Sequence, residues 1–527
     1  MDNAQLPAMV SDLLLPDRYD PAPERVELVQ THASWVFLAG DFVYKVKKPV
    51  DFGFLNFSTL AKRRFYCREE LRLNRRLGGD YYLRVEEVVW RDGAFYFGGK
   101  GRVADYAVVM RRLPERFLMK RLLAEDKLSV DHLNDLAALL CDFYRQAPVY
   151  TDGRFGTRKK VEFDVEENFT QTECFVGETI EKRDFENIRD FSRDFLKRKH
   201  KLFVRRVREG AIREGHGDLH MEHVCLPPEG PLVFDCIEFN QRFRRLDVVN
   251  DLAFLAMDLE ENNRFDLASS FLESCRRDLD GLFEPAMVFF YKCYRAYVRG
   301  KVLSFLSGDM NLDIEARERA GERAARYFRL ASIYAAAPPR GLILLAGISG
   351  SGKSWLARAL SNLWGMKWLR SDEVRKELFG LSGQSAAAPF GQGIYSRKAT
   401  VRTYQALARQ AVEALAEGRD VLVDATNLKV ADRYFFYETV AALETPPPVS
   451  LVVCRAPRRV LEENLRHRSQ TGDVSDADLN IARRQRFEPP TPEELERVSW
   501  FEIDTGKDLV EQLYQLISAV RSRPGGF

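Results

Sequence analysis

The chain has 527 residues; 45% of them are hydrophobic, 30% are charged, and the formal net charge is +2. This length is too great for one hydrophobic core and implies two or three domains, and the composition is that of an ordinary globular protein. The near-neutral charge excludes a chain-wide basic footprint for nucleic acid but leaves local basic surfaces open.

The cysteines, the N-terminal segment and the longest apolar stretch indicate the compartment. The eight cysteines include no C-x-x-C pair, and several lie in apolar runs, where a reduced buried thiol is expected. The N-terminal segment MDNAQLPAMVSDLLLPDRYD is acidic and lacks the basic start of a signal peptide. The stretch Met287–Leu306 is interrupted by four basic residues, too many charges for a membrane span. We therefore expect a soluble, cytoplasmic protein without a membrane partner.

The predicted elements divide the chain into two parts. Residues Ser34–Lys48 (SWVFLAGDFVYKVKK) predict a β-hairpin that turns at Ala39–Asp41, and mainly helix is expected from about Ile188 onward. The segment Tyr334–Gly341 (YAAAPPRG) is the best linker candidate, and a charged helix over roughly 313–334 precedes it. We therefore place the domains at residues 1–337 and 338–527.

A histidine-rich loop in the first part is the first candidate site. Residues His216–His223 read HGDLHMEH and are followed by an apolar strand, a turn and a second strand, PLVFDCIEF. The histidines invite a zinc interpretation, but zinc ligands usually lie on a rigid helix or in knuckles, and no cysteine or carboxylate shows the expected spacing. The Gly-Asp pair between the histidines indicates a turn, so we do not expect zinc here.

The same loop resembles the catalytic loop of aminoglycoside phosphotransferases and choline-kinase-like enzymes, which is related to the protein-kinase loop H-R-D-x-x-x-x-N. The resemblance implies a protein-kinase-like α+β fold that binds ATP. It assigns Lys45 to the α- and β-phosphates, with Glu70 as its ion-pair partner and Glu69 as the alternative. It also makes Asp218 the base that accepts the proton of the substrate hydroxyl, and Asp235 the metal-binding aspartate.

A later segment and one departure complete this resemblance. The segment LDVVNDLAFL, with Asp247 and Asp251, resembles the family's support behind the site. The family usually has asparagine where this chain has His223, and Mg²⁺ prefers oxygen over imidazole nitrogen. Four interpretations stay open: one metal held by Asp235, a metal bound by the neutral His223 imidazole with a preference for ions such as Mn²⁺, a weakened site, or a degenerate nucleotide-binding relic.

The second part begins on a phosphate-binding motif. Residues Gly341–Ser354 read GLILLAGISGSGKS, and the P-loop pattern G-x-x-x-x-G-K-[ST] spans Gly347 to Ser354. Backbone N–H groups curl around the phosphates of a nucleotide, Lys353 neutralises the outer phosphates, and Ser354 can hold Mg²⁺. The helical segment WLARALSNL places the phosphates at a helix N-terminus. The expected nucleotide-binding residues are Gly347, Ser349, Gly350, Ser351, Gly352, Lys353 and Ser354.

Strands and helices alternate through the rest of this part. The apolar strands are LILLAG, MKWLRS, DVLVDAT, VSLVVCR and SWFEID. Strands that alternate with helices predict βαβ units and a doubly wound α/β fold with a parallel sheet.

A carboxylate follows the second of these strands. Asp372, in LRSDEVRKELFG, lies where ligands bind in open α/β sheets and is well placed to accept a proton from an acceptor hydroxyl. Arg375, one turn later, is a candidate contact for the phosphate of an acceptor. The alternative is that Asp372 caps the helix and Arg375 lies on its solvated face.

Two further segments carry a second resemblance. The pattern S-D-x-x-R-K-E-L-F-G, with a strand ending in DATN at Asp424–Asn427, is similar to the small P-loop kinases that include polynucleotide 5′-kinases, zeta toxins and chloramphenicol phosphotransferase, an AAA-like ATP-binding group. The resemblance makes Asp372 the general base and Arg375 an acceptor contact. It places Asp424 near the metal or the acceptor, and Thr426 and Asn427 along the pocket.

The segment CRAPRRVLEENLRHRSQTGDVSDAD resembles the arginine-bearing lid of these kinases. Asn464 stands where an arginine is expected, so Arg466 and Arg468 are the remaining candidates for clamping the transferred phosphoryl group. The alternative is a solvated basic face of a helix.

Together these features predict a fusion of two ATP-handling kinase domains. The predicted reaction is Mg²⁺-ATP-dependent transfer of the γ-phosphoryl group to a hydroxyl of a small molecule, a nucleotide or a nucleic-acid 5′ end. Two alternatives are an ATP-driven regulatory or binding protein with a degenerate N-terminal domain, and an antibiotic-modifying enzyme. Asp372 beside the P-loop favours a kinase, because a simple ATPase needs a water-positioning group but no acceptor arginine.

Overall fold

The computed structural model describes residues 6–381, 393–471 and 479–521 of the chain. These residues form two compact units, each built from several stretches of the chain. The first unit comprises residues 1–170, 192–259 and 270–295, and the second unit comprises residues 171–191, 260–269 and 296–527. Because the units exchange segments along the chain, the boundary between residues 337 and 338 stays a prediction.

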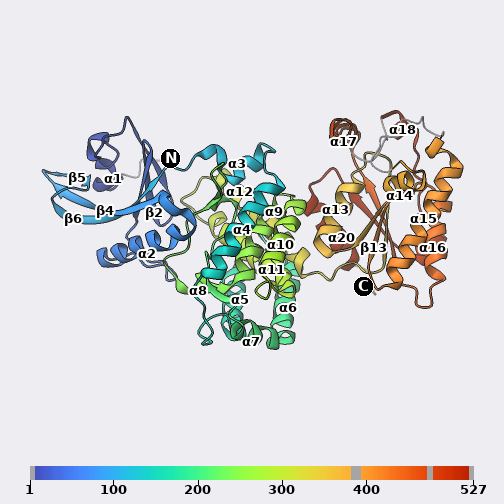
Figure 1. Ribbon diagram of the computed structural model, residues 1–527, viewed down its shortest axis with the longest axis horizontal. Coiled ribbons are helices and arrows are strands. Elements are labelled where there is room, and N and C mark those ends of the chain that lie inside the picture. Colours follow the sequence, from blue (N-terminus) through green and yellow to red (C-terminus); the bar gives the residue numbers. More distant parts are fainter. Residues whose placement is uncertain (1–5, 382–392, 472–478, 522–527) are drawn as a thin grey trace. The chain divides into compact units, whose positions relative to one another are not determined.

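A six-stranded antiparallel sheet in the order β1-β2-β3-β6-β4-β5 opens the first unit (Figure 1). Its strands are β1 Val26–Gln30, β2 Ser34–Ala39, β3 Phe42–Lys47, β4 Tyr82–Arg91, β5 Ala94–Phe97 and β6 Arg102–Arg111. The predicted hairpin is confirmed, since β2 pairs with β3 and Gly40 makes the turn with a φ of 61°. Helix α2, Leu60–Gly78, is capped by the Thr59 side chain and packs against β4 and β6.

Helices follow the sheet along the chain. They include α3 Met119–Ala124, α4 Val130–Gln146, α5 Arg158–Thr172, α7 His200–Arg208, α9 Val248–Glu261, α10 Phe265–Asp278 and α11 Pro285–Ser307. The expectation that helix dominates only from about Ile188 is wrong, because α3, α4 and α5 precede that residue. Helix α4 carries local signals for its start: Ser129 and His132 form a capping box, and apolar residues at helical spacing are buried.

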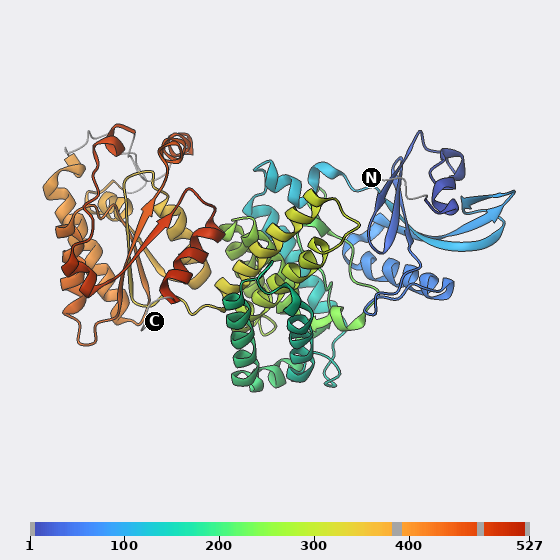
Figure 2. The same ribbon diagram turned by 180° about the vertical axis from the view of Figure 1, so that it is seen from behind.

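Five parallel strands form the sheet of the second unit, in the order β12-β13-β11-β14-β15. They are the five predicted strands: β11 Leu342–Ala346, β12 Lys367–Arg370, β13 Val421–Asp424, β14 Val449–Arg455 and β15 Ser499–Asp504. Helices α13 Lys353–Trp364 and α20 Leu509–Arg521 lie on one face, and α15 Arg397–Ala416 and α16 Val430–Ala441 on the other (Figures 1 and 2). Every residue of β11 is buried, as expected for a central parallel strand. The predicted doubly wound α/β fold is confirmed.

A long helix ahead of the P-loop belongs to the same unit as this sheet. Helix α12, Ile314–Ala335, is capped by Asp313 and packs against α20. Arg326 forms a 2.8 Å ion pair with Asp508, and Arg329 forms a 3.2 Å ion pair with Glu511. The second unit therefore extends well to the N-terminal side of the P-loop. Among the described residues, no helix is both long and apolar enough to cross a membrane.

Candidate active sites

Two lysines of β3 converge on one glutamate in the first unit. Lys45 and Lys47 point to the same side of the strand because side chains alternate with a period of two. Glu70 of α2 bridges them: its Oε1 lies 2.9 Å from Nζ of Lys45, and its Oε2 lies 2.5 Å from Nζ of Lys47. Nζ of Lys45 also lies 2.6 Å from Oδ1 of Asp235, and the buried Lys47 pairs with Glu238. The predicted trio of lysine, glutamate and aspartate is thus brought together.

The helix decides between the two candidate glutamates. Glu69, the neighbour of Glu70, forms a 2.9 Å ion pair with Arg72 instead. Burial of Lys45 disfavours its charge, but Asp235 and Glu70 outweigh burial and hold the pKa of its ammonium above the ordinary value. Burial likewise opposes the charge of Glu70, and the two lysines outweigh it and lower the pKa of that carboxyl. The cluster is therefore charged at neutral pH.

A buried aspartate behind the histidine-rich loop fixes its backbone. Oδ2 of Asp251, on α9, accepts the N–H of His216 at 2.7 Å and the hydroxyl of Tyr144 at 3.0 Å, while Oδ1 accepts the N–H of Gly217 at 3.0 Å. Gly217 has a φ of 88°, a conformation that favours glycine. These bonds support the predicted role of the Asp251 segment behind the site. Asp247, by contrast, is buried in an ion pair with Arg206.

The loop leaves Asp218 and Asp235 partly open to solvent. Their side chains are 35% and 40% exposed, whereas the partner lysine and glutamate are largely buried. Oδ2 of Asp218 lies 3.4 Å from Nε2 of His220 and 3.6 Å from Nδ1 of His223. Nε2 of His223 lies 3.6 Å from Oδ2 of Asp235. The ring of His223 therefore stands between the proposed base and the proposed metal ligand.

The three histidines of the loop differ in their roles. His216 is fully buried; its Nε2 donates to the oxygen of Phe234 at 2.9 Å, and burial lowers its pKa to about 3. Burial and the neighbouring His220 also lower the pKa of His223. Asp218, His220 and His223 offer ligand atoms within 4.8 Å of one another. The sequence argument that the histidines lack a carboxylate partner at a suitable spacing is wrong. The turn itself places Asp218 beside His220 and His223.

The P-loop has the expected course from β11 into α13. Gly347, Gly350 and Gly352 have φ values of 144°, 83° and 79°, which L side chains rarely adopt. A Cβ atom on Gly352 would lie 2.9 Å from Cβ of Thr505, so this glycine is also required by packing. Nζ of Lys353 donates to the backbone oxygens of Gly347 at 2.9 Å and Ile348 at 2.8 Å.

Three side chains that the sequence did not single out for this purpose contact the P-loop. Thr505, after β15, donates to the oxygen of Ser351 at 2.8 Å, and Asn464 donates to the oxygen of Gly350 at 2.8 Å. Gln485 does the opposite: its Oε1 accepts the N–H of Ser349 at 2.7 Å. The amide oxygen of Gln485 therefore accepts the N–H of Ser349, which the sequence analysis assigned to phosphate binding. Asn464, noted only as a departure from arginine, gains a defined contact.

Asp424, at the end of β13, lies against the P-loop serine. Its carboxyl group is buried and lies close enough to the hydroxyl of Ser354 for that hydroxyl to act on its pKa. Burial raises the pKa of Asp424, while Lys353 and the Ser354 hydroxyl act in the lowering direction. Asp372 is close enough to raise the same pKa further. Hydroxyl and carboxylate oxygens therefore meet where Mg²⁺ was predicted, and these hard ligands fit that ion.

The second predicted carboxylate lies inside a helix and not at its cap. Helix α14 spans Ser371–Leu378, and its N-cap residue is Arg370, two positions before Asp372. Asp372 belongs to the first turn, beside Glu373, which pairs with Arg370 at 2.9 Å. The alternative of a capping role for Asp372 is therefore not supported by the position of the helix start.

The predicted arginines are placed differently from one another. Arg375 is buried; its Nη1 donates to the oxygen of Ile394 at 2.8 Å, and its guanidinium lies 5.2 Å from the ring centre of Tyr395. Arg466, on α17 (Arg458–Thr471), is 68% exposed with Glu462 at 3.9 Å. The side chain of Arg468 lies outside the described residues. The acceptor and clamp roles of all three stay predictions.

A buried ion pair anchors the segment that carries Gln485. Arg433 of α16 and Glu494 of α19 (Pro492–Arg497) are both fully buried and lie 2.7 Å apart. Arg433 also donates to the oxygen of Asn427 at 3.1 Å, and Asn427 donates to the oxygen of Leu345 at 2.7 Å. The loop after β13 is thereby tied both to the P-loop strand and to the chain that follows Gln485. The N–H of Gly347 donates to the oxygen of Thr426 at 3.0 Å.

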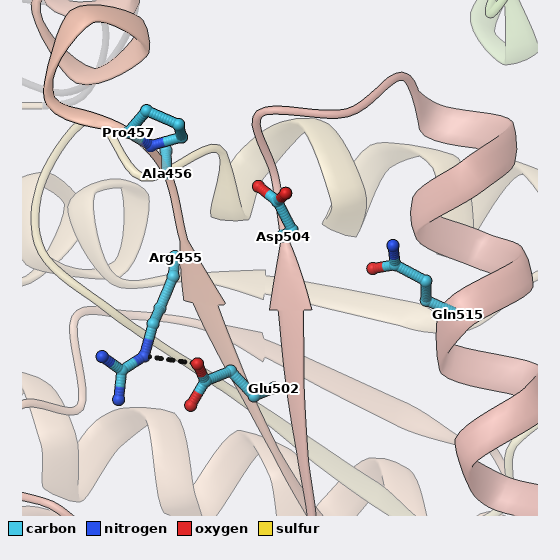
Figure 3. A pocket seen from close by; sticks show the side chains of 6 residues that line it. All are labelled: Arg455, Ala456, Pro457, Glu502, Asp504 and Gln515. Carbon is cyan, nitrogen blue, oxygen red and sulfur yellow. Dashed lines mark ion pairs between the residues drawn. The ribbon is translucent and has the colours of Figure 1, made fainter.

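A cavity of about 370 Å³ opens at the ends of β14 and β15 (Figure 3). Arg455 and Glu502 pair across it at 2.8 Å, and it is lined by Arg455, Ala456, Pro457, Glu502, Asp504 and Gln515. Asp504 directly precedes Thr505, which contacts the P-loop. The cavity thus lies at the carboxyl edge of a parallel sheet, where ligands bind in open α/β folds.

Known proteins with similar sequences or folds match different parts of the chain. Residues 342–490 match the AAA domain family. The solved structures with similar folds include a gluconokinase from Sinorhizobium meliloti 1021, with 20% identity, 34% of this chain and 93% of that chain covered, and a TM-score of 0.25. They also include a choline kinase from Cryptosporidium parvum Iowa II, with 9% identity, 61% and 93% covered, and a TM-score of 0.36. The matched residues 342–490 contain the P-loop and the strands β11 to β14, so this part of the second unit is similar to AAA domains.

Two curated relatives match most of the chain. They are the uncharacterized protein Rv2004c of Mycobacterium tuberculosis and the uncharacterized protein Mb2027c of Mycobacterium bovis. Each is 30% identical over 410 residues, which cover 76% of this chain and 78% of the relative. The chain belongs to the family of these mycobacterial proteins.

Proposed function

We propose that the chain is an ATP-dependent phosphotransferase that moves the γ-phosphoryl group of ATP to a hydroxyl. One observation carries this proposal: the buried carboxyl group of Asp424 is close enough to Lys353, Ser354 and Asp372 for all three to shift its pKa. Ser354 and Asp424 would hold Mg²⁺, which neutralises charge on the phosphates. Asp372 is then a separate carboxylate, available to accept the proton of an acceptor hydroxyl.

The first unit supports a second phosphotransfer site. Lys45, held by Glu70, would meet the α- and β-phosphates, and the partly exposed Asp218 would accept the proton of a second hydroxyl. Asp235 faces the same space with a carboxylate oxygen. The charged state of the lysine–glutamate pair at neutral pH suits phosphate binding.

The surroundings of the P-loop suggest where the rest of the nucleotide lies. The cavity beside Pro457 and Asp504 is the candidate position for the nucleoside end, because Thr505 links its rim to the P-loop. Arg375, Arg466 and Arg468 remain the candidates for the acceptor side and the lid. The acceptor is a small molecule, a nucleotide or a nucleic-acid 5′ end.

ATP turnover with and without a pool of hydroxyl acceptors tests the proposal. A kinase releases little free phosphate alone and forms ADP faster when an acceptor is present. The rival function, an ATP-driven regulatory or binding protein, gives ADP and free phosphate at a rate that acceptors do not change.

Replacing Asp372 with asparagine separates chemistry from nucleotide binding. The change should leave ATP affinity unchanged and lower transfer by roughly a hundredfold or more, because a positioned general base contributes about that much. Glu373→Gln is the matched control, since it removes a charge from the same helical turn. Equal transfer by both variants, with the same loss of melting temperature, would show that Asp372 only stabilises the helix.

Replacing Gln485 with glutamate tests whether its contact marks the phosphate position. The new carboxylate would stand beside the N–H of Ser349 and repel the phosphates. We expect ATP affinity to fall by about tenfold, an electrostatic effect of about 1.4 kcal/mol, with a smaller change for Gln485→Leu. The measurement is isothermal titration with ATP and with ADP. Unchanged ATP affinity in the glutamate variant would place Gln485 away from the bound phosphates.

A further inference from the structure

We propose that the first unit binds a divalent transition-metal ion, not Mg²⁺, through Nε2 of His223 and Oδ2 of Asp235. This inference deepens the proposed function, on which it rests, by naming the metal class of its first site. This first site offers a ring nitrogen and a carboxylate oxygen to a metal ion. The P-loop site, by contrast, offers the oxygens of a hydroxyl and a carboxylate.

The hydrogen bonding of His223 presents one ring nitrogen to the site. Nδ1 lies 2.9 Å from the backbone oxygen of Asp218. A carbonyl oxygen can only accept, so Nδ1 carries the proton and the neutral ring offers a lone pair on Nε2. Metal-binding histidines commonly donate their other ring N–H to a backbone carbonyl in this way. The ring is thus oriented as a metal ligand.

The position of Nε2 of His223 fits an ion that is shared with the carboxylate of Asp235. It lies 3.6 Å from Oδ2 of Asp235, so two electron-pair donors face each other across a gap. Ligand atoms at about 2.0–2.2 Å from one metal ion lie roughly 2.8–3.6 Å apart, from octahedral to tetrahedral angles, so the gap lies at the upper end of this range. Lys45 contacts the other oxygen of Asp235, Oδ1, at 2.6 Å, which leaves Oδ2 turned toward the histidine. The spacing therefore fits one bridging cation.

The neighbouring His220 packs against His223 and adds a second imidazole next to the proposed metal site. The ring of His220 packs on that of His223 with centroids 4.1 Å apart, and its Nε2 lies 3.4 Å from Oδ2 of Asp218. Imidazole is a poor ligand for Mg²⁺, which is a hard ion, and a good ligand for transition metals. Asparagine at position 223 would instead supply an oxygen. The chemistry of the donors thus points away from Mg²⁺ in this site.

Binding of Mn²⁺ to the full-length protein tests the inference without relying on activity. The free ion is followed by its electron paramagnetic resonance signal, Mg²⁺ is added as competitor, and pulsed measurements detect magnetic coupling of bound Mn²⁺ to imidazole nitrogen. The variants are His223→Asn and Asp235→Asn at the site, His220→Asn beside it, and His200→Asn as the control, because His200 is an exposed histidine on α7.

The wild type and the controls should bind Mn²⁺ with nitrogen coupling. His223→Asn should lose the coupling and reduce the preference for Mn²⁺ over Mg²⁺ by about tenfold or more, and Asp235→Asn should lose the nitrogen-coupled ion while Mn²⁺ at the Ser354–Asp424 site remains bound. Coupling that survives in His223→Asn, disappears in His220→Asn, or is absent from the wild type overturns the inference. ATP binding, measured on the same samples, reports separately on the proposed function, so the two can fail independently.

Discussion

Replacing Lys353 with alanine is expected to lower ATP turnover at the P-loop by about a hundredfold or more. Removing one preorganised electrostatic donor from an active site has an effect of this size. The Lys353 ammonium lies within the loop, where it donates to the oxygens of Gly347 and Ile348, and it is close to Asp424. It is therefore positioned to turn to the β- and γ-phosphates when a nucleotide binds.

The measurement requires the full-length chain, because α12 packs on α20 within the second unit and a fragment that starts near the P-loop lacks that helix. Turnover at the first unit is removed by working in an Asp218→Asn background. Lys367→Ala is the matched control, since it removes an exposed lysine from the start of β12. Normal ATP turnover by the Lys353 variant in this background would show that the P-loop does not handle the nucleotide.

Asp218→Asn is expected to abolish most phosphotransfer by the first unit while nucleotide binding there persists. General-base catalysis contributes about a hundredfold to ten-thousandfold, and asparagine keeps the shape of aspartate without its basicity. Asp251 holds the backbone of the loop through the N–H groups of His216 and Gly217, so the fold should be retained. The assay is acceptor phosphorylation in a Lys353→Ala background.

The control for this change lies in the same loop. Glu222→Gln removes an exposed carboxylate that pairs with Lys120, and it should leave transfer unchanged. If Asp218→Asn and Glu222→Gln behave alike, and neither alters turnover, the first unit contributes no chemistry and serves as a nucleotide-binding or structural domain.

Local patterns predicted the parts of the molecule that depend on neighbours in the sequence. The hairpin at Ala39–Asp41, the five strands of the parallel sheet and the P-loop follow from turn residues, alternation and glycine spacing. The site in the first unit was also predictable, because Lys45 and Asp218 lie in segments that resemble a known family. The choice between Glu69 and Glu70 was not, since the rotation of α2 about its axis decides it.

Contacts between distant segments could not be predicted from the sequence. Lys47 and Glu238 are 191 residues apart, and Ser349 and Gln485 are 136 apart. No periodicity or spacing rule links such pairs. The choice between a capping position and an internal position for Asp372 also depended on a helix boundary, which sequence patterns place only to within about two to four residues. The start of α14 at Ser371, after the N-cap Arg370, removed the capping alternative.

In the histidine-rich loop, a turn brings together residues that sequence rules for metal-ligand spacing do not connect. Metal-ligand spacings are derived from helices and knuckles, and the HGDLHMEH loop matches neither. The backbone nonetheless folds Asp218 against His220 and His223, while His216 turns away to the oxygen of Phe234. The residue types invited a zinc interpretation that the spacing argued against, and only the fold showed which of these residues face one another.

Transfer of label from [γ-³²P]ATP into a metabolite extract tests the central claim most directly. The wild-type chain should place the label on one or more acceptors. Asp218→Asn and Asp372→Asn should each remove the product of their own site, and the double variant should remove all of it. Release of labelled free phosphate without any labelled acceptor, at the same rate in all four proteins, would contradict the account.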